Sequence, residues 1–134
     1  MNYPHPDALV SSNWLADHFR TSNVRVLDGT YFLPNIPRNA HDEFQAEHIP
    51  GAAFFDIDDI KDSDNSLPHM LPTPEVFSNK IRKLGIKNTD RIIIYDRMGF
   101  FSAPRVWWTF RVFGHKSVAI LDGGLHKWLA EGRL

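Results

Sequence analysis

Short apolar runs alternate along the chain with segments in which apolar residues recur at helical spacing. Four runs have the length and residue types of buried strands: Val24–Leu27, Ala53–Phe55, Arg91–Tyr95 and Val118–Leu121. The runs are largely continuous in apolar residues, a pattern typical of strands covered on both faces in a parallel sheet. The first, third and fourth runs lead directly into a carboxylate, at Asp28, Asp96 and Asp122.

Helical patterns occupy the intervals between these runs, and we predict four helices. Three begin at the candidate caps Ser12, Thr73 and Ser102, and the fourth is marked by apolar residues from Leu125. Pro74 and Pro104 stand in the first turns of two of them, where proline is tolerated, and Gly85 is placed to end the helix that follows Thr73. The helix that begins at Ser102 is apolar nearly all round, so we expect it to be deeply packed.

The order of strands and helices predicts an α/β fold built from βαβ units. One local alternative stays open, because Asp28-Gly29 has the composition of a tight hairpin turn. No clean strand pattern follows Gly29, so the parallel arrangement is favoured.

Length and composition limit the class of protein. The chain has 134 residues, of which 43% are hydrophobic, enough for one domain with a substantial core. The net charge of −1 gives no support for binding to nucleic acid or to a membrane surface. No apolar run approaches the roughly 18 residues that span a bilayer, and we find no secretory signal. The chain ends soon after a helical pattern, as if cut from a longer protein.

Cysteine is absent from the chain. This excludes disulfides, thiolate metal sites and a cysteine nucleophile within it, and it fits a cytoplasmic location. The seven histidines do not show the spacing of metal ligands. We therefore expect neither a metal ion nor a cofactor.

The junction after Tyr95 is the first candidate site. A loop between a parallel strand and a helix presents backbone N–H groups and the positive end of the helix, which favours an anion. Yet this loop opens with the carboxylate of Asp96, which repels an anionic ligand unless Arg97 or Arg105 neutralises it. The alternative, favoured from these residues alone, is that Asp96 is a turn residue accepting hydrogen bonds from loop N–H groups.

Two other segments carry candidate groups. In the polar stretch 56–72, Asp58 and His69 are a carboxylate and an imidazole that could form part of a catalytic triad. No hydroxyl partner is identifiable, and a solvated loop with turn-forming Asp residues is the favoured interpretation. His48, which precedes the turn at Pro50-Gly51, is expected to make a structural hydrogen bond to the backbone.

Six motifs, in the same order along the chain, resemble those of the rhodanese family. The signature F-x-x-x-H-I-P-G-A-x-x-F is present from Phe44 to Phe55. The others are VRVLDGT at 24–30, FFDID at 54–58, LPHMLP at 67–72, FSAPRVWWTFRVFGH at 101–115 and VAILDGG at 118–124. Together they cover nearly the whole chain and resemble the N-terminal half of the two-domain thiosulfate and 3-mercaptopyruvate sulfurtransferases.

The resemblance implies a fold and a division of labour. The fold is rhodanese-like, a five-stranded parallel sheet flanked by helices on both faces. Residues 1–134 would form a single such domain, the N-terminal, non-catalytic half of a longer protein. In that family the other half carries a catalytic Cys, which takes sulfur from thiosulfate or 3-mercaptopyruvate and passes it to cyanide or a thiol. The corresponding position in this half is typically Asp, and here it is Asp96.

The resemblance also implies roles for individual residues. A degenerate active-site loop comprises five of them: Asp96, Arg97, Gly99, Ser102 and Arg105. Asp58 and His69 occupy positions thought to support a relay to a Ser in the catalytic loop of the missing domain. The expected partners are therefore the C-terminal catalytic domain and small sulfur-containing substrates, and we expect this chain alone to be inactive.

Two alternatives and one restriction accompany this interpretation. The chain could instead be a stand-alone, catalytically inactive rhodanese module that acts in protein interaction or regulation. A phosphatase of the same fold requires a Cys in its anion-binding loop and is excluded by the composition. The substrate-binding arginines of the family belong to the other half, so that role is not assigned to Arg38, Arg97 or Arg105.

Overall fold

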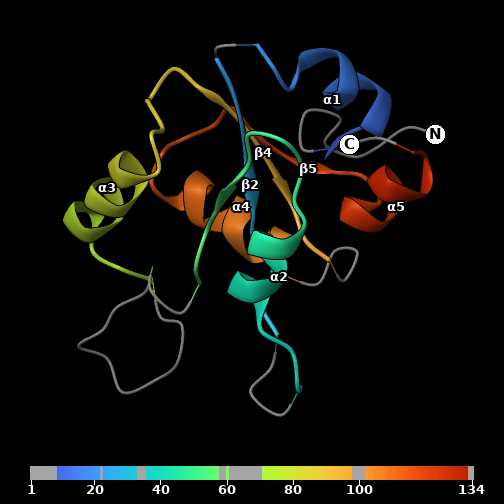
Figure 1. Ribbon diagram of the computed structural model, residues 1–134. Helices are drawn as coiled ribbons and strands as arrows, with labels where there is room; N and C mark the ends of the chain where they lie inside the picture. Colours follow the sequence, from blue (N-terminus) through green and yellow to red (C-terminus); the bar gives the residue numbers. More distant parts are fainter. Residues whose placement is uncertain are drawn as a thin grey trace.

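The structure is a computed structural model, and it describes residues 9–21, 23–32, 36–57, 60, 71–97 and 102–132. Strands and helices alternate along this part of the chain (Figure 1). The strands are β1 (Leu9–Val10), β2 (Val24–Asp28), β3 (Ala53–Phe54), β4 (Arg91–Tyr95) and β5 (Val118–Leu121). The helices are α1 (Ser12–His18), α2 (Ala40–Ala46), α3 (Pro74–Lys83), α4 (Ala103–Val112) and α5 (Gly124–Ala130). The four predicted strands are confirmed, and β1 is added to them.

The five strands form one parallel sheet in the order β1-β5-β4-β2-β3. At the end of β2, Asp28 pairs in parallel register with Tyr95 of β4 and with Phe54 of β3. The chain therefore does not turn back at Asp28-Gly29, and the hairpin alternative is wrong. The α/β fold with a five-stranded parallel sheet is confirmed.

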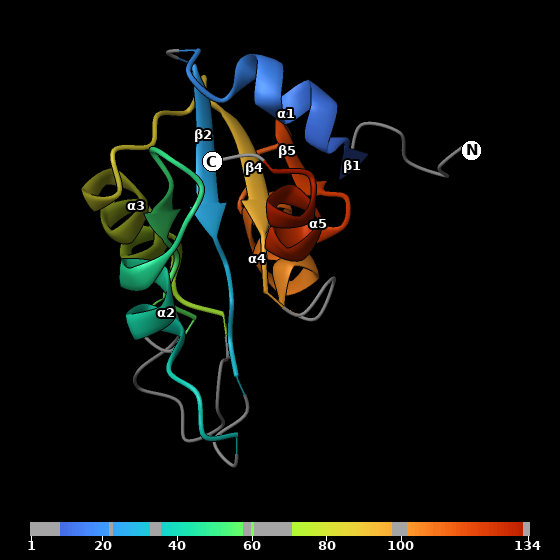
Figure 2. The ribbon, with the colours of Figure 1, turned by 45° about the vertical axis from the view of Figure 1, so that its right-hand side comes forward.

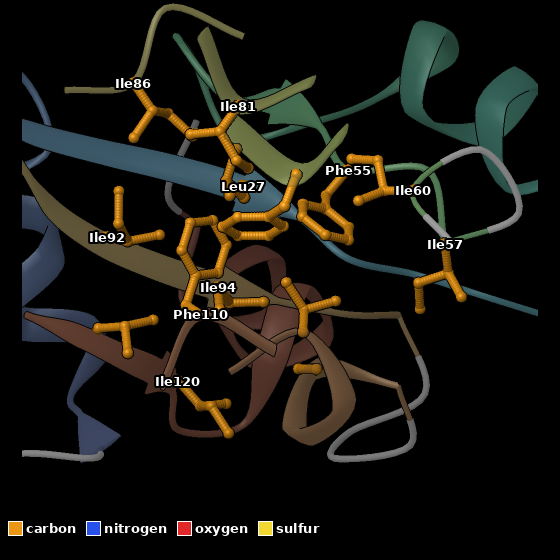
Figure 3. Close-up of a cluster of buried hydrophobic side chains, with 14 residues drawn as sticks. Leu27, Phe55, Ile57, Ile60, Ile81, Ile86, Ile92, Ile94, Phe110 and Ile120 are labelled. Carbon is orange, nitrogen blue, oxygen red and sulfur yellow. The ribbon is translucent and has the colours of Figure 1, made fainter. Parts of the chain in front are cut away.

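Helices cover both faces of this sheet (Figures 1 and 2). Side chains of α3 and α4 form one buried core with the sheet (Figure 3), and side chains of α1 and α5 form the other. Successive residues of β4 divide between the two, with Ile92 and Ile94 in the first core and Ile93 and Tyr95 in the second. This explains why the strand is a continuous apolar run, since both of its faces are covered.

Two helix starts test the capping predictions. At α1 the cap is Ser11, whose Oγ accepts a hydrogen bond from the N–H of Trp14 at 3.0 Å. Ser12, one residue later, is buried and donates to Glu131, so the prediction was wrong by one residue. At α3 the prediction is confirmed, because the Oγ1 of Thr73 accepts from the N–H of Val76 at 3.3 Å.

Helix α4 is less buried than the sequence predicted. Val106 and Phe110 are fully buried on the side that faces the sheet, but Trp108 and Val112 are 48% and 46% exposed. These two residues are four apart and so share one face of the helix. The expectation of deep packing all round is wrong, because the sheet covers only one side of α4.

Gly29 lets the end of β2 approach α4 closely. A Cβ added at this position would lie 2.8 Å from Cγ2 of Val106 and 3.2 Å from Cγ2 of Ile94. A side chain there would push the helix away from the sheet, at the cost usual for an overpacked core. The missing side chain places the backbone of residue 29 beside the start of α4.

Candidate functional site

The carboxylate of Asp96 lies at the start of α4 and is 1% exposed. Its Oδ2 accepts hydrogen bonds from the N–H groups of Ser102, at 2.9 Å, and Ala103, at 2.7 Å. These N–H groups stand where a helix has no acceptor of its own and where its positive end attracts an anion. The position that could bind an anion is therefore filled by a carboxylate of the same chain. This agrees with the alternative favoured from the sequence, in which Asp96 accepts hydrogen bonds from backbone N–H groups.

Ser102 precedes the first residue of α4, as predicted, but its side chain does not cap the helix. Its Oγ donates to the carbonyl of Gly29 at 2.7 Å and accepts from the N–H of Tyr31 at 3.0 Å. The hydroxyl thus ties the start of α4 to the segment after β2, and the capping role belongs to Asp96. Capping by Ser102 is a wrong prediction, because the hydroxyl finds both partners in another element.

Arg97 is buried beside α2, with only 8% of its side chain exposed. Its Nη2 donates to Oδ2 of Asp28 at 3.4 Å, to the carbonyl of Glu43 at 3.1 Å and to the carbonyl of Glu47. Its backbone N–H donates to Oγ1 of Thr30 at 3.1 Å. Arg97 therefore forms its ion pair with Asp28, whereas the sequence had suggested Asp96 as its partner, and it also binds the C-terminal carbonyls of α2.

Asp28 is fully buried at the end of β2. Its Oδ1 accepts from the N–H of Thr30 at 2.9 Å. Burial raises the pKa of Asp28, and the hydrogen bonds from Thr30 and the charge of Arg97 oppose that rise. Burial, together with the negative charge of Asp28, also raises the pKa of Tyr95, whose hydroxyl accepts from the N–H of Ile49 at 3.3 Å.

Of the remaining candidate residues, the structure describes two and leaves three outside the described ranges. Arg105 lies in the first turn of α4 with its guanidinium 6.0 Å from the ring centre of Trp108, and burial lowers its pKa. Nδ1 of His48 lies 2.7 Å from the carbonyl of Phe44, which is the structural hydrogen bond that was expected. Three candidates, Gly99, Asp58 and His69, lie outside the described residues.

A small cavity of about 170 Å³ opens at the carboxyl ends of β2 and β3, near the loop that begins at Asp96. Thr30, Arg38 and Asp56 are among its lining residues. Arg38 is engaged by Glu43 of α2 through two hydrogen bonds, at 2.8 and 2.6 Å. Its guanidinium is therefore held against the protein itself, and no substrate-binding role is assigned to it.

In the described residues of the site, two N–H groups bind an anionic side chain, and the chain offers no thiol nucleophile. The chain has no cysteine, and the hydroxyl of Ser102 is engaged as both donor and acceptor. Within the described ranges, no group of three or more His, Asp or Glu side chains could hold a metal ion.

Comparison with known proteins identifies the architecture. The family model described as the rhodanese-like domain matches residues 11–131. The chain belongs to the rhodanese-like domain family. The motifs found in the sequence had indicated this family, and both the family and its fold are confirmed.

The rhodanese-like chain is similar to several named sulfurtransferases. It is 49% identical over 126 residues to thiosulfate/3-mercaptopyruvate sulfurtransferase 1, mitochondrial, of Arabidopsis thaliana, covering 94% of this chain and 33% of that protein. It is 45% identical over 130 residues to human 3-mercaptopyruvate sulfurtransferase, covering 92% of this chain and 44% of that protein. The chain thus spans less than half the length of these curated relatives.

A solved structure supports the same placement. The crystal structure of SseA from Escherichia coli, presented as a 3-mercaptopyruvate sulfotransferase with the rhodanese fold, superposes with a TM-score of 0.90 at 42% identity. The match covers 95% of this chain and 49% of SseA. In the described part of this rhodanese-like chain, no helix has the length and apolar character needed to cross a membrane.

Sequence reasoning singled out the loop residues but missed how they are joined. The pairing of Arg97 with Asp28 and the tie from Ser102 to Gly29 were not foreseen. One signal was available, because Asp28 directly follows an apolar strand and a carboxylate in that position needs a buried partner. The identity of the partner could not be read from the sequence.

Proposed function

We propose that the parent of this rhodanese-like domain is a sulfurtransferase that moves sulfur from thiosulfate or 3-mercaptopyruvate to cyanide or a thiol. This chain is then its N-terminal, non-catalytic half. The observation that carries the proposal is the buried carboxylate of Asp96, bound by the N–H groups of Ser102 and Ala103. The names of the relatives support the parent activity.

The chemistry of sulfur transfer explains why this loop is assigned to the non-catalytic half. A persulfide-forming enzyme of this kind needs a thiolate, which is stabilised by loop N–H groups and a helix N-terminus. In this chain a carboxylate takes up those donors and there is no thiol to replace it. The start of α4 therefore offers the N–H donors that a thiolate would need, and this chain lacks the group that would accept sulfur.

The proposed role of this half is to pack against a catalytic partner domain and to form one wall of the cleft between them. Asp58 and His69 would reach toward a Ser of that domain, with the imidazole moving a proton and the carboxylate holding its tautomer. This assignment rests on the motif positions in the sequence. The cytoplasmic location stays a prediction, since the Arabidopsis relative is named as mitochondrial.

The isolated chain should not transfer sulfur. We expect no thiosulfate:cyanide or 3-mercaptopyruvate:thiol activity above background from the purified 134-residue chain, because it has no thiol to carry the sulfur. The same assay on the full-length parent serves as the positive control. Robust turnover by the isolated chain would contradict the assignment to a non-catalytic half, and an inactive parent would contradict the sulfurtransferase function.

His69→Ala in the full-length parent tests the relay. We expect turnover of 3-mercaptopyruvate to fall by about 100-fold, the lower part of the range for loss of a general acid–base group, with an unchanged melting temperature. His126→Ala is the matched control, because His126 is an exposed residue of α5. Unchanged kinetics in the His69 variant would remove this residue from the mechanism.

A further inference from the structure

A cavity of about 540 Å³ lies between α3 and the C-terminal half of α4. The segment that leads from α3 into β4 also lines it, through Ile86 and Lys87, as does His115 before β5. Ile86, Lys87 and His115 precede the amino ends of β4 and β5, whereas Asp96 follows the carboxyl end of β4. The cavity is thus separate from the site described above.

The floor of the cavity is a set of aromatic rings that fix one another. Phe77 of α3 is buried and meets the buried Phe110 of α4 edge to face, with ring centres 5.2 Å apart. Phe113 stacks on Phe77 at 4.5 Å with an interplanar angle of 21°. Rings held in this way form a fixed apolar lining in advance of any ligand, which is typical of small-molecule sites.

The rim of the cavity is basic. Arg82 and Lys87 line it as exposed cations, and His115 lines it as well; among the described residues that line it, none is Asp or Glu. The ring of His115 is held in place, since its Nε2 lies 2.9 Å from the carbonyl of Asp90. The carboxylate of Asp90 adjoins the rim, where its Oδ2 accepts the backbone N–H of Lys87 at 2.8 Å, and its charge is paired with Arg25 at 3.6 Å.

We propose that this cavity binds a small organic monoanion, an aromatic or branched-chain carboxylate. Its apolar body would lie on Phe77 and Phe113, and its carboxylate would lie at Arg82 and Lys87. A volume of about 540 Å³ falls in the range of small-ligand sites. A neutral apolar ligand would leave the cations of the rim unused, and a polyanion without an apolar part would leave the aromatic floor unused. The proposal is independent of sulfur transfer, because it uses none of the residues around Asp96.

The test uses phenylacetate and its uncharged isostere phenylacetamide as probes of the 134-residue chain. Titrations followed by amide chemical shifts should perturb residues at the cavity, including Arg82 and Lys87, and should leave Ser102 and Ala103 unchanged. For ligands of this size we expect a dissociation constant on the order of 1 mM, with the acid at least about threefold tighter than the amide. Equal affinities, or shifts confined to other surfaces, would overturn the proposal.

Variants of the rim separate the charge from the cavity itself. Arg82→Gln with Lys87→Gln should weaken phenylacetate by about threefold to tenfold and leave phenylacetamide unchanged. Lys83→Gln is the matched control, since Lys83 is an exposed cation of the same helix that does not line the cavity. Ser78→Trp at the exposed mouth should block both probes. Unaltered phenylacetate binding in the rim double variant or in Ser78→Trp would refute the proposal, whatever the outcome of the sulfur-transfer assays.

Discussion

The carboxylate of Asp96 accepts two hydrogen bonds from backbone groups that α4 cannot satisfy internally. It is almost fully buried, so water does not replace these bonds if the side chain is removed. One residue thus supplies the cap of the helix and occupies the position where a reactive thiolate would need the same donors. Under the proposed function, the cap of this helix and the inability of the loop to accept sulfur have the same physical cause.

Asp96→Ala should lower the free energy of unfolding by about 1–3 kcal/mol, because two buried N–H groups lose their acceptor. Urea denaturation of the isolated chain measures the change. Asp96→Asn is the control, since its amide oxygen still accepts a hydrogen bond, and it should cost less than the alanine variant. An alanine variant as stable as the wild type would show that α4 does not depend on this cap.

At the scale of elements, α2 depends on contacts at its two ends. The helix has seven residues, none of them buried, and a helix of this length is not stable by itself. Asn39 caps its start by accepting from the N–H of Asp42 at 2.8 Å. Arg97 binds carbonyls at its end and joins them to the buried Asp28 of β2. The guanidinium of Arg97 therefore ties the end of α2 to the sheet, in addition to the contacts that the rings of His41 and Phe44 make with Phe54 of β3.

Arg97→Met should destabilise the chain by about 3 kcal/mol at pH 7, because it leaves the buried carboxylate of Asp28 without its counter-charge. The loss should be smaller near pH 4. Burial raises the folded-state pKa of Asp28 above 3.8, so the folded state binds a proton more readily than the unfolded state. The contribution of Asp28 to stability therefore falls as the pH rises through the two pKa values. Removing Arg97 raises the folded pKa further and enlarges the loss at neutral pH.

Chemical denaturation of the wild type and of Arg97→Met between about pH 4 and pH 7 measures this difference. Adding Asp28→Asn to Arg97→Met should remove most of the pH dependence, since no buried charge remains to be compensated. A difference that stays constant over the same range would mean that Arg97 acts through the carbonyls of α2 alone.

At the scale of the whole molecule, α4 presents an apolar face that the described residues leave open. Trp108 and Val112 are each nearly half exposed on one face of the helix. The chain spans less than half the length of the relatives with which it was compared. We propose that the partner domain covers this face, since intramolecular interfaces of this kind are moderate in size and partly polar.

Trp108→Ser should destabilise the isolated chain by about 1 kcal/mol, because about half of the indole is already buried there. In the full-length parent we expect a larger loss, about 2 kcal/mol, because the contact would also bury the exposed part of the indole. Leu129→Ser on α5, where Leu129 is 38% exposed, is the matched control and should have the same effect in both proteins. Hydrogen exchange of α4 that is the same in both would place the interface elsewhere.

The sequence by itself determined the class of the fold and most of its elements, although β1 was not predicted. Apolar runs, the cap at Thr73 and the glycine after α3 act between neighbouring residues, and motifs of contiguous residues placed the chain in the rhodanese-like family. The absence of cysteine excluded a thiol nucleophile on composition alone. These features depend on composition or on interactions between residues close together in the chain, so the sequence alone is enough to identify them.

Only the tertiary structure decided which groups meet. Arg97 and Asp28 are 69 residues apart, and Ser102 and Gly29 are 73 apart, yet each pair is in contact because β2 and β4 are neighbours in the sheet. The exposure of Trp108 and the basic rim of the cavity likewise depend on how α3 and α4 pack on the sheet. Such contacts follow from strand order and packing, which no stretch of neighbouring residues encodes alone.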